Sequence, residues 1–202
     1  MPNRRRFLQS AITLSAVSMP AISAWPAGAR SAEAPILRLE RFVFDNRFPE
    51  AVEVARHAAR RQVRLAEISG DLTALWYEDL DLLWKNAPMV LGGVTTRHGL
   101  FVLETLAADR GMRVVYRGEH AAPQQGTAAH SLSGPADLLA RAASESNASL
   151  WARLARAMTQ CPAGPGEPAN LELATPIEHA STRHEPLLSW IIAPRSSTTP
   201  LI

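Results

Sequence analysis

One stretch of the chain combines glycines, hydroxyl groups and basic side chains at a spacing that suits anion binding. It is GGVTTRHG, residues 92–99, and it directly follows an apolar run. The pattern predicts a buried strand that leads into a helix, whose free N–H groups attract carboxylate, sulfate or phosphate. The side chains expected beside those groups are Thr95, Thr96, Arg97 and His98. In the simpler alternative, Thr95 or Thr96 only caps the helix.

Polar side chains also follow the other predicted strands. Asp45 and Arg47 come after the first strand, and Asp71 comes after the second. The fourth strand is followed by Arg117, Glu119 and His120. Ligands of open parallel sheets bind outside the carboxyl ends of the strands, so we expect these loops to share one edge and to hold a small anion. Arg47 would bind it with both guanidinium nitrogens, unless it pairs with an acid in a turn.

The histidines allow a second chemistry at the same edge. His98 and His120 both fall there, and a histidine beside a carboxylate such as Glu119 can act as a general base. An enzyme of this kind is therefore one alternative function. His179 and His184 are five residues apart, which differs from the spacing of a helical zinc-binding His-Glu-x-x-His motif, so we expect no metal site.

Other reactive or aromatic residues favour structural roles. Trp76, Tyr77 and Trp84 stand at helical spacing, which favours core packing over an aromatic ligand wall. Cys161 is the only cysteine, which excludes an intrachain disulfide and a cysteine-built metal centre. It lies among prolines and glycines, where a low-pKa nucleophile is hard to build. The sequence identifies no cofactor, and the glycine spacing of residues 92–99 matches neither a Walker loop nor a dinucleotide fingerprint.

The elements expected to position these residues alternate in type. Apolar runs predict strands over 37–44, 63–68, 89–94 and 113–116. Amphipathic stripes between them predict helices over 49–61, 72–84 and 100–110. This alternation predicts a three-layer α/β domain with a mainly parallel sheet of about five strands, in a flavodoxin-like or Rossmann-like arrangement.

The pattern is weaker in the second half. Residues 121–135 are interpreted as a polar loop, 135–144 and 149–160 as two helices, and the stretch after 160 as a long loop. The apolar run 187–193 predicts the last strand. A single domain is therefore expected over 30–195, followed by a disordered tail over 196–202.

The N-terminus has the features of an export signal. Arg4 and Arg5 are followed, after one residue, by Phe7 and Leu8, and then by a short, weakly apolar stretch. This order resembles the twin-arginine (Tat) signal peptide, and Ala27-Gly28-Ala29 is the expected cleavage site. The resemblance implies a signal over residues 1–29, contact with the Tat translocase during export, and a periplasmic or secreted protein without a stable membrane anchor.

The net charge of the mature domain argues against nucleic acid as a partner. Loss of Arg4, Arg5 and Arg6 with the signal lowers the 21 basic residues to 18, against 19 acidic ones, and a near-neutral domain is not expected to bind nucleic acid. The leading hypothesis is a periplasmic protein that binds a small anion. Because many Tat passengers travel with a cofactor-bearing partner, an accessory or assembly subunit of an exported redox complex is a further alternative.

Overall fold

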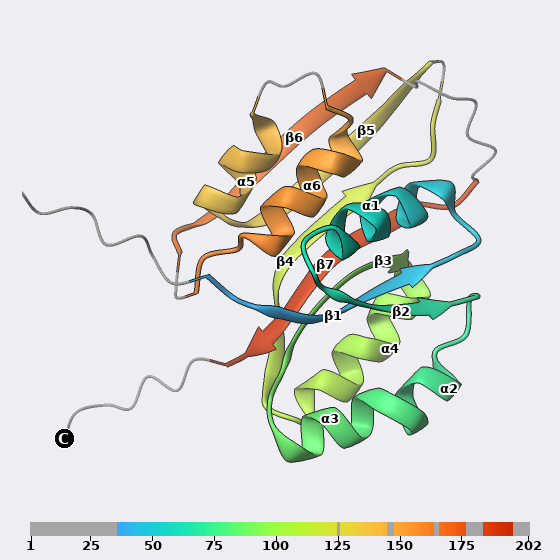
Figure 1. The fold of residues 1–202 in the computed structure, drawn as a ribbon. Coiled ribbons are helices and arrows are strands. Elements are labelled where there is room, and N and C mark those ends of the chain that lie inside the picture. The colour runs from blue at the N-terminus through green and yellow to red at the C-terminus, as the bar shows by residue number, and fades with distance from the viewer. Residues whose placement is uncertain (1–35, 125, 145–147, 164–165, 177–183, 196–202) are drawn as a thin grey trace, which may run out of the picture. The chain divides into compact units, whose positions relative to one another are not determined.

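The described part of the chain forms one seven-stranded mixed sheet with helices on both faces (Figure 1). The computed structural model describes residues 36–124, 126–144, 148–163, 166–176 and 184–195, which belong to the compact unit Ala34–Ile202. The predicted signal (1–29) and the predicted tail (196–202) lie outside the described residues. Within those ranges, no helix has the length and apolar character needed to cross a membrane.

The strands lie in the order β2-β1-β3-β7-β4-β5-β6. Their bounds are β1 (Leu39–Asp45), β2 (Arg64–Ile68), β3 (Val90–Thr96), β4 (Met112–His120), β5 (Thr127–Pro135), β6 (Pro168–Pro176) and β7 (Leu187–Pro194). The helical elements are α1 (Pro49–Ala59), α2 (Thr73–Leu75), the π-helical η1 (Trp76–Leu80), α3 (Asp81–Asn86), α4 (Arg97–Ala108), α5 (Ala136–Ala143) and α6 (Leu150–Thr159).

The first half of the chain follows the predicted alternation of strands and helices. β1 pairs in parallel with both β2 and β3, and helices connect consecutive strands. Pro49 stands at the start of α1, where its fixed φ suits a helix and its missing N–H is not needed. The stripe Ala51, Val54, Ala55 and Ala58 is buried against the sheet, as its helical spacing predicts.

The prediction of a mainly parallel, five-stranded, flavodoxin-like or Rossmann-like sheet is wrong. β7 inserts between β3 and β4 and is antiparallel to both, and β4, β5 and β6 also pair in antiparallel fashion. The sheet therefore contains two parallel and four antiparallel pairings. The broader α/β assignment is confirmed.

Two strands were mistaken for loops. β5 lies in the predicted polar loop 121–135, and β6 lies in the predicted long loop after residue 160. One face of β5 is buried through Ala128, His130 and Leu132, while the residues between them are exposed. Because only Leu132 of these is large and apolar, the alternation gives a weak hydrophobic signal although it has the period of a strand.

Two apolar cores lie on opposite faces of the sheet. α1, α5 and α6 cover one face, where Phe42, Tyr116 and Ile191 are fully or almost fully buried (Figure 1). α3 and α4 cover the other, where Trp190 is completely buried. Burial of a large side chain stabilises a fold by about 1.5–3 kcal/mol, so these layers fix the strand ends on which the polar residues stand.

Candidate ligand-binding site at the carboxyl edge of the sheet

The predicted site residues gather at one edge of the sheet but on two of its faces. β1, β2 and β3 end at this edge, and β4 ends there too because β3 and β4 are both antiparallel to β7. Thr96 and His120 both lie opposite Leu187. The side chains of Arg117 and Glu119 reach α4, whereas His120 contacts Trp151 of α6 on the other face. One pocket therefore cannot contain the whole predicted set.

Thr95 and Thr96 have structural roles at the start of α4. The Thr96 hydroxyl oxygen accepts a hydrogen bond from the backbone N–H of Gly99 at 3.3 Å, as in an N-cap. Thr95 is fully buried, accepts a hydrogen bond from Nε1 of Trp190 at 3.0 Å and donates to the Thr96 carbonyl at 3.3 Å. The two hydroxyls thus satisfy protein groups, which agrees with the simpler sequence interpretation.

Arg47 is held by Asp45. Nε and Nη2 of Arg47 donate to the two carboxylate oxygens of Asp45 at 2.9 and 2.7 Å, and the backbone N–H of Arg47 donates to the same carboxylate at 3.2 Å. The Asp45 hydrogen bond is the main cause that raises the pKa of Arg47. The guanidinium lies so close to Gly70 that a Cβ there would stand 2.7 Å from Cζ. A side chain at position 70 would therefore displace the ion pair.

The other two basic side chains of the predicted set are also paired with carboxylates. Arg97 donates to Glu119 in an exposed ion pair. Arg117 donates to Glu104 of α4 at 2.6 Å. Because each guanidinium at this edge already has a carboxylate partner, the edge attracts an external anion much less than the sequence suggests.

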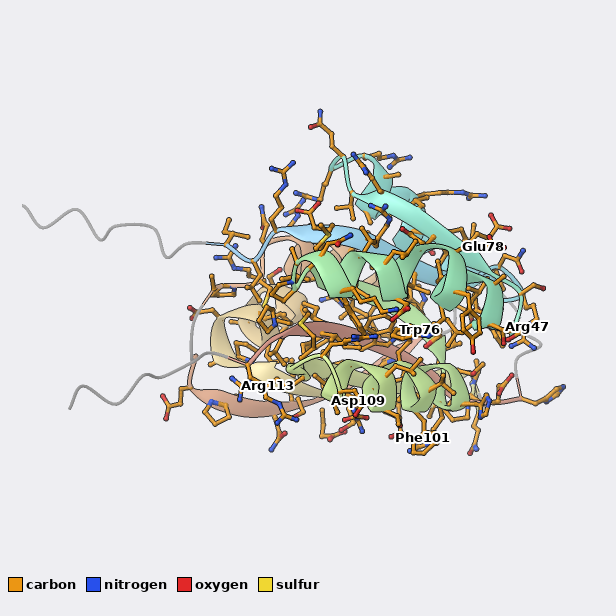
Figure 2. All side chains as sticks on the ribbon, turned by 90° about the horizontal axis from the view of Figure 1, so that it is seen from below. Arg47, Trp76, Glu78, Phe101, Asp109 and Arg113 are labelled. Carbon is orange, nitrogen blue, oxygen red and sulfur yellow. The ribbon has the colours of Figure 1, made fainter. Side chains whose placement is uncertain are left out.

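A pocket of about 330 Å³ opens at this edge, on the face covered by α3 and α4. It is lined by Gly70, Asp71, Leu72, Thr73, Trp76, Tyr77, His98, Val102 and Leu106. Two of the predicted site residues, Asp71 and His98, are among them. Figure 2 shows Trp76 between its own helical segment and α4, with Arg47 at the adjoining end of the molecule.

The aromatic wall of the pocket comes from the π-helical segment η1. A π-helical turn inserts an extra residue into a helix and is frequent at functional sites. Trp76 packs edge-on against buried Trp84, with ring centroids 6.0 Å apart, and Nε1 of Trp84 donates to the Met89 carbonyl at 3.0 Å. Tyr77, by contrast, is 71% exposed. Trp84 of α3 therefore belongs to the core as predicted, while Trp76 and Tyr77 of η1 line a pocket.

Asp71 is the ionised group of the pocket. Its Oδ1 accepts hydrogen bonds from the backbone N–H and the hydroxyl of Thr73 at 2.9 and 2.7 Å. These bonds lower the pKa of Asp71, so the carboxylate stays charged at neutral pH. His98, the second residue of α4, is exposed at the mouth of the same pocket. The lining of the pocket therefore combines a carboxylate and an imidazole with the aromatic rings of Trp76 and Tyr77.

His120 belongs to a buried polar chain on the opposite face. Its Nδ1 lies 2.9 Å from Nδ1 of His130, and its Nε2 lies 2.8 Å from the hydroxyl oxygen of Ser189. Ser189 is also 2.9 Å from the hydroxyl of Tyr116, and Nε2 of His130 lies 2.9 Å from the hydroxyl of Thr175.

This buried polar chain is continuously hydrogen-bonded and is closed to substrates. Each ring nitrogen of His120 and His130 lies within hydrogen-bond distance of another polar atom, so both buried imidazoles are satisfied within the protein. Ser189 and His120 are both fully buried, which excludes direct attack on a bound molecule in this conformation. Sequence reasoning missed His130 because β5 was assigned to a loop. Its alternation with buried Ala128 and Leu132 was the available signal.

No metal site is visible in the described ranges. Within them, no three or more histidine, cysteine, aspartate and glutamate side chains are grouped to hold an ion. His179, one of the two histidines considered for zinc, lies outside the described residues. His184 is described and exposed.

Comparison of the chain with protein-family models, with curated proteins and with solved structures found no match.

Proposed function

We propose that this domain is an exported binding protein that holds a small amphipathic molecule in the pocket between α4 and the α2–η1–α3 segment. The observation on which this depends is the joint lining of one pocket by Trp76, Tyr77 and ionised Asp71. A volume of about 330 Å³ is within the range of small-molecule sites, which are mostly apolar with a few placed polar groups.

The lining also favours one ligand chemistry. The apolar body of the ligand would lie against Trp76, Val102 and Leu106 along the groove between the helices. Its head group would meet Asp71, which accepts hydrogen bonds and attracts positive charge. Trp and Tyr rings attract cations through their negatively charged faces, so aromatic side chains and carboxylate act together. A cationic or hydrogen-bond-donating head group therefore fits better than an anionic one.

The anionic ligand expected from the sequence is less well supported. An anion at Arg47 would compete with the two short hydrogen bonds from Asp45, whose carboxylate is 1% exposed. Withdrawal of that arginine would leave a buried carboxylate without its main partner, at a cost of several kcal/mol. We therefore do not propose anion binding at this edge, and the experiment below would detect it as tighter binding of an anionic probe.

Three probes of similar size and different charge test the ligand chemistry. Benzyltrimethylammonium, benzyl alcohol and benzoate are titrated into the purified full chain, and binding is followed by tryptophan fluorescence. We expect the cation to bind about tenfold more tightly than benzoate, which corresponds to ~1.4 kcal/mol. Equal or tighter binding of benzoate would overturn the proposed chemistry.

Paired variants locate the binding. Asp71→Asn keeps the oxygen that caps Thr73 but removes the charge, and should lower the affinity for the cation to that for benzyl alcohol. Tyr77→Ala should weaken binding of the cation and of benzyl alcohol. Asp137→Asn, an exposed carboxylate on α5, and Phe101→Ala, an exposed aromatic on α4, are the matched controls. Loss of binding in the controls as well would mean that the probes bind elsewhere.

The resemblance of the N-terminus to a twin-arginine signal supports a role outside the cytoplasm. Replacement of Arg4 and Arg5 by lysine keeps the charge but removes the motif. We expect this change to abolish export, measured as the fraction of protein in the periplasm. Undiminished export of the double variant would contradict the assignment.

A further inference from the structure

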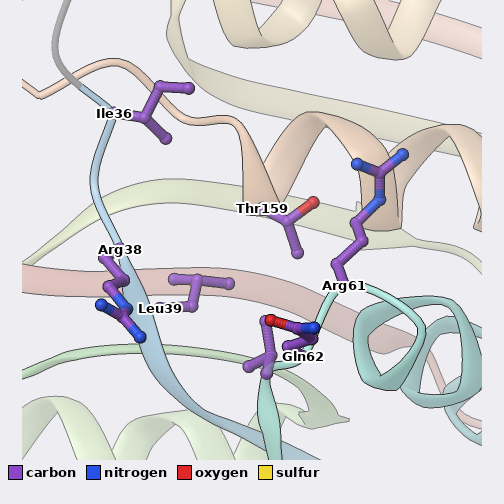
Figure 3. Close-up of a pocket in the computed structure, with 7 residues that line it drawn as sticks. Ile36, Arg38, Leu39, Arg61, Gln62 and Thr159 are labelled. Atoms are coloured by element: carbon purple, nitrogen blue, oxygen red, sulfur yellow. The ribbon is translucent and has the colours of Figure 1, made fainter.

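A second hollow, of about 420 Å³, lies at the opposite end of the sheet, where β1 and β2 begin. It is lined by Ile36, Arg38, Leu39, Arg61, Gln62, Val63 and Thr159. Figure 3 shows that these side chains come from three segments, the start of β1, the turn between α1 and β2, and the end of α6, and that Arg38 and Arg61 point to different sides of the hollow. It shares no lining residue with the pocket at the carboxyl edge.

The backbone of Gln62 is unusual. Its φ is +64°, and among the described residues no other non-glycine residue has a positive φ. The backbone N–H of Gln62 donates to the Ala59 carbonyl at 2.8 Å, and that of Val63 donates to the Ala58 carbonyl at 3.3 Å. These two bonds form a Schellman motif with Gln62 at the left-handed position, which is usually glycine because a Cβ is unfavourable there.

Contacts within the described part of the protein do not account for a glutamine at this position. Across the described ranges, the exposed side chains of Gln62 and Arg61 make no hydrogen bond or ion pair to the protein. Arg38 has only a long contact to Glu40, at 3.9 Å, and its side chain is 90% exposed. Three side chains able to donate hydrogen bonds therefore line this hollow without a firm partner in the described structure.

Helix stabilisation accounts for part of this arrangement only. A helix C-terminus carries a partial negative charge, so Arg61 beside the end of α1 stabilises the helix. Gln62 is neutral and gains nothing from that field. A ligand that its amide contacts would explain both its side chain and its strained backbone, because strained residues persist where function requires them.

We propose that this hollow is a second binding site, which takes a small organic molecule with an oxyanion group and a hydroxyl. Arg61 binds the oxyanion, since a guanidinium group matches carboxylate and phosphate oxygens. The Gln62 amide adds a donor and an acceptor. The Thr159 hydroxyl donates to the Ala155 and Arg156 carbonyls at 2.8 and 3.1 Å, so its oxygen is left to accept a hydrogen bond from the ligand hydroxyl.

The apolar residues of the hollow complete the site. Leu39 and Val63 stand between the polar groups and the core, and Ile36 lies at the outer side. They provide a surface for the carbon skeleton of the ligand, which inorganic phosphate lacks. A hydroxycarboxylate such as citrate should therefore bind more tightly than orthophosphate.

The decisive variant is Gln62→Gly, because the proposal predicts opposite effects on stability and on binding. Glycine relieves the left-handed strain, so the thermal midpoint without ligand should rise by about 2–4 °C. The increase in midpoint caused by citrate or orthophosphate, measured against sodium chloride at equal ionic strength, should fall by more than half. Arg61→Gln should remove the same increase without raising the starting midpoint.

Two matched controls make the result decisive. Arg113→Gln changes an exposed arginine on β4 that does not line the hollow, and should leave the response to anions unchanged. Asp137→Asn, which changes an exposed carboxylate on α5 that lines neither pocket, should do the same. An unchanged anion response in Gln62→Gly, or the absence of any anion-specific response in the wild type, would overturn the proposal.

Discussion

The two halves of the sheet handle polar groups differently. In the parallel half, β3 is buried along its whole length, and polar side chains appear at its carboxyl end, beside the pocket. In the antiparallel half, β5 buries alternate residues, and a polar chain runs through the interior from Tyr116 to Thr175. The parallel half thus depends on close packing, whereas the antiparallel half depends also on satisfied hydrogen bonds.

The glycines of β3 test the packing of the parallel half, where we expect the largest effect. A Cβ at Gly93 would stand 2.4 Å from the Val43 carbonyl oxygen and 2.5 Å from the Trp190 ring, so Gly93→Ala should lower the free energy of unfolding by about 3 kcal/mol. At Gly92 the nearest atom is the flexible end of Leu39 at 3.0 Å, so Gly92→Ala should cost less than about 1 kcal/mol. Chemical denaturation measures both values. Equal losses of unfolding free energy in the two variants would show that β3 does not pack more closely against Val43 and Trp190 at Gly93 than against Leu39 at Gly92.

Ser189 tests the polar chain of the antiparallel half, with an intermediate effect. Ser189→Ala removes the partner that the structure shows for the Tyr116 hydroxyl and for Nε2 of His120, so it should destabilise the fold by about 1–3 kcal/mol. Tyr116→Phe removes one hydroxyl from the same chain and should cost about 1 kcal/mol. The double variant should cost less than the sum of the two, because the two hydroxyls share one hydrogen bond. Strict additivity would show that the residues do not act as a chain.

The buried thiol of Cys161, which follows α6, tests how tightly this helical layer is closed. Of the three tests it has the smallest expected effect on stability. Burial raises the pKa of its thiol to about 11 from the ordinary 9.0, so the native protein should react very slowly with thiol reagents at pH 8. The chain in urea should react rapidly. The neutral thiol is favoured in the folded state, so its contribution to stability is present below about pH 9 and is lost as pH rises towards 11. Fast labelling under native conditions would show that the layer of α6 opens readily.

Sequence reasoning predicted well where local patterns were strong. The stripe of α1, the buried run of β3 and the apolar run of β7 all form the expected elements. The same reasoning failed for the order and direction of the strands, because β7 has the composition of a buried strand whichever direction it runs. β5 and β6 were missed for a different reason: polar residues interrupt the apolar ones in both, so neither strand contains an apolar run.

The candidate site was predicted only in part for a similar reason. Asp71 and His98 were placed at the correct edge because β2 and β3 are parallel, so the segments that follow them begin at the same edge. That Arg47 pairs with Asp45 and Arg97 with Glu119 depends on side-chain distances, which spacing along the chain does not provide. These pairings change the expected ligand from an anion to a cation or hydrogen-bond donor.

The sequence by itself determined the helical stripes, the buried strands and the polar residues that follow them, since each depends on the period of apolar residues along the chain. The tertiary structure alone decided the strand order, the face on which each polar residue lies and the partner of each charge. These depend on packing between segments far apart in the chain. His120 illustrates the difference: the local pattern predicts a strand over 113–116 with His120 in the loop after it, whereas in the structure His120 is the last residue of β4 and is buried beside His130 and Ser189, because β5 and β7 pair with β4.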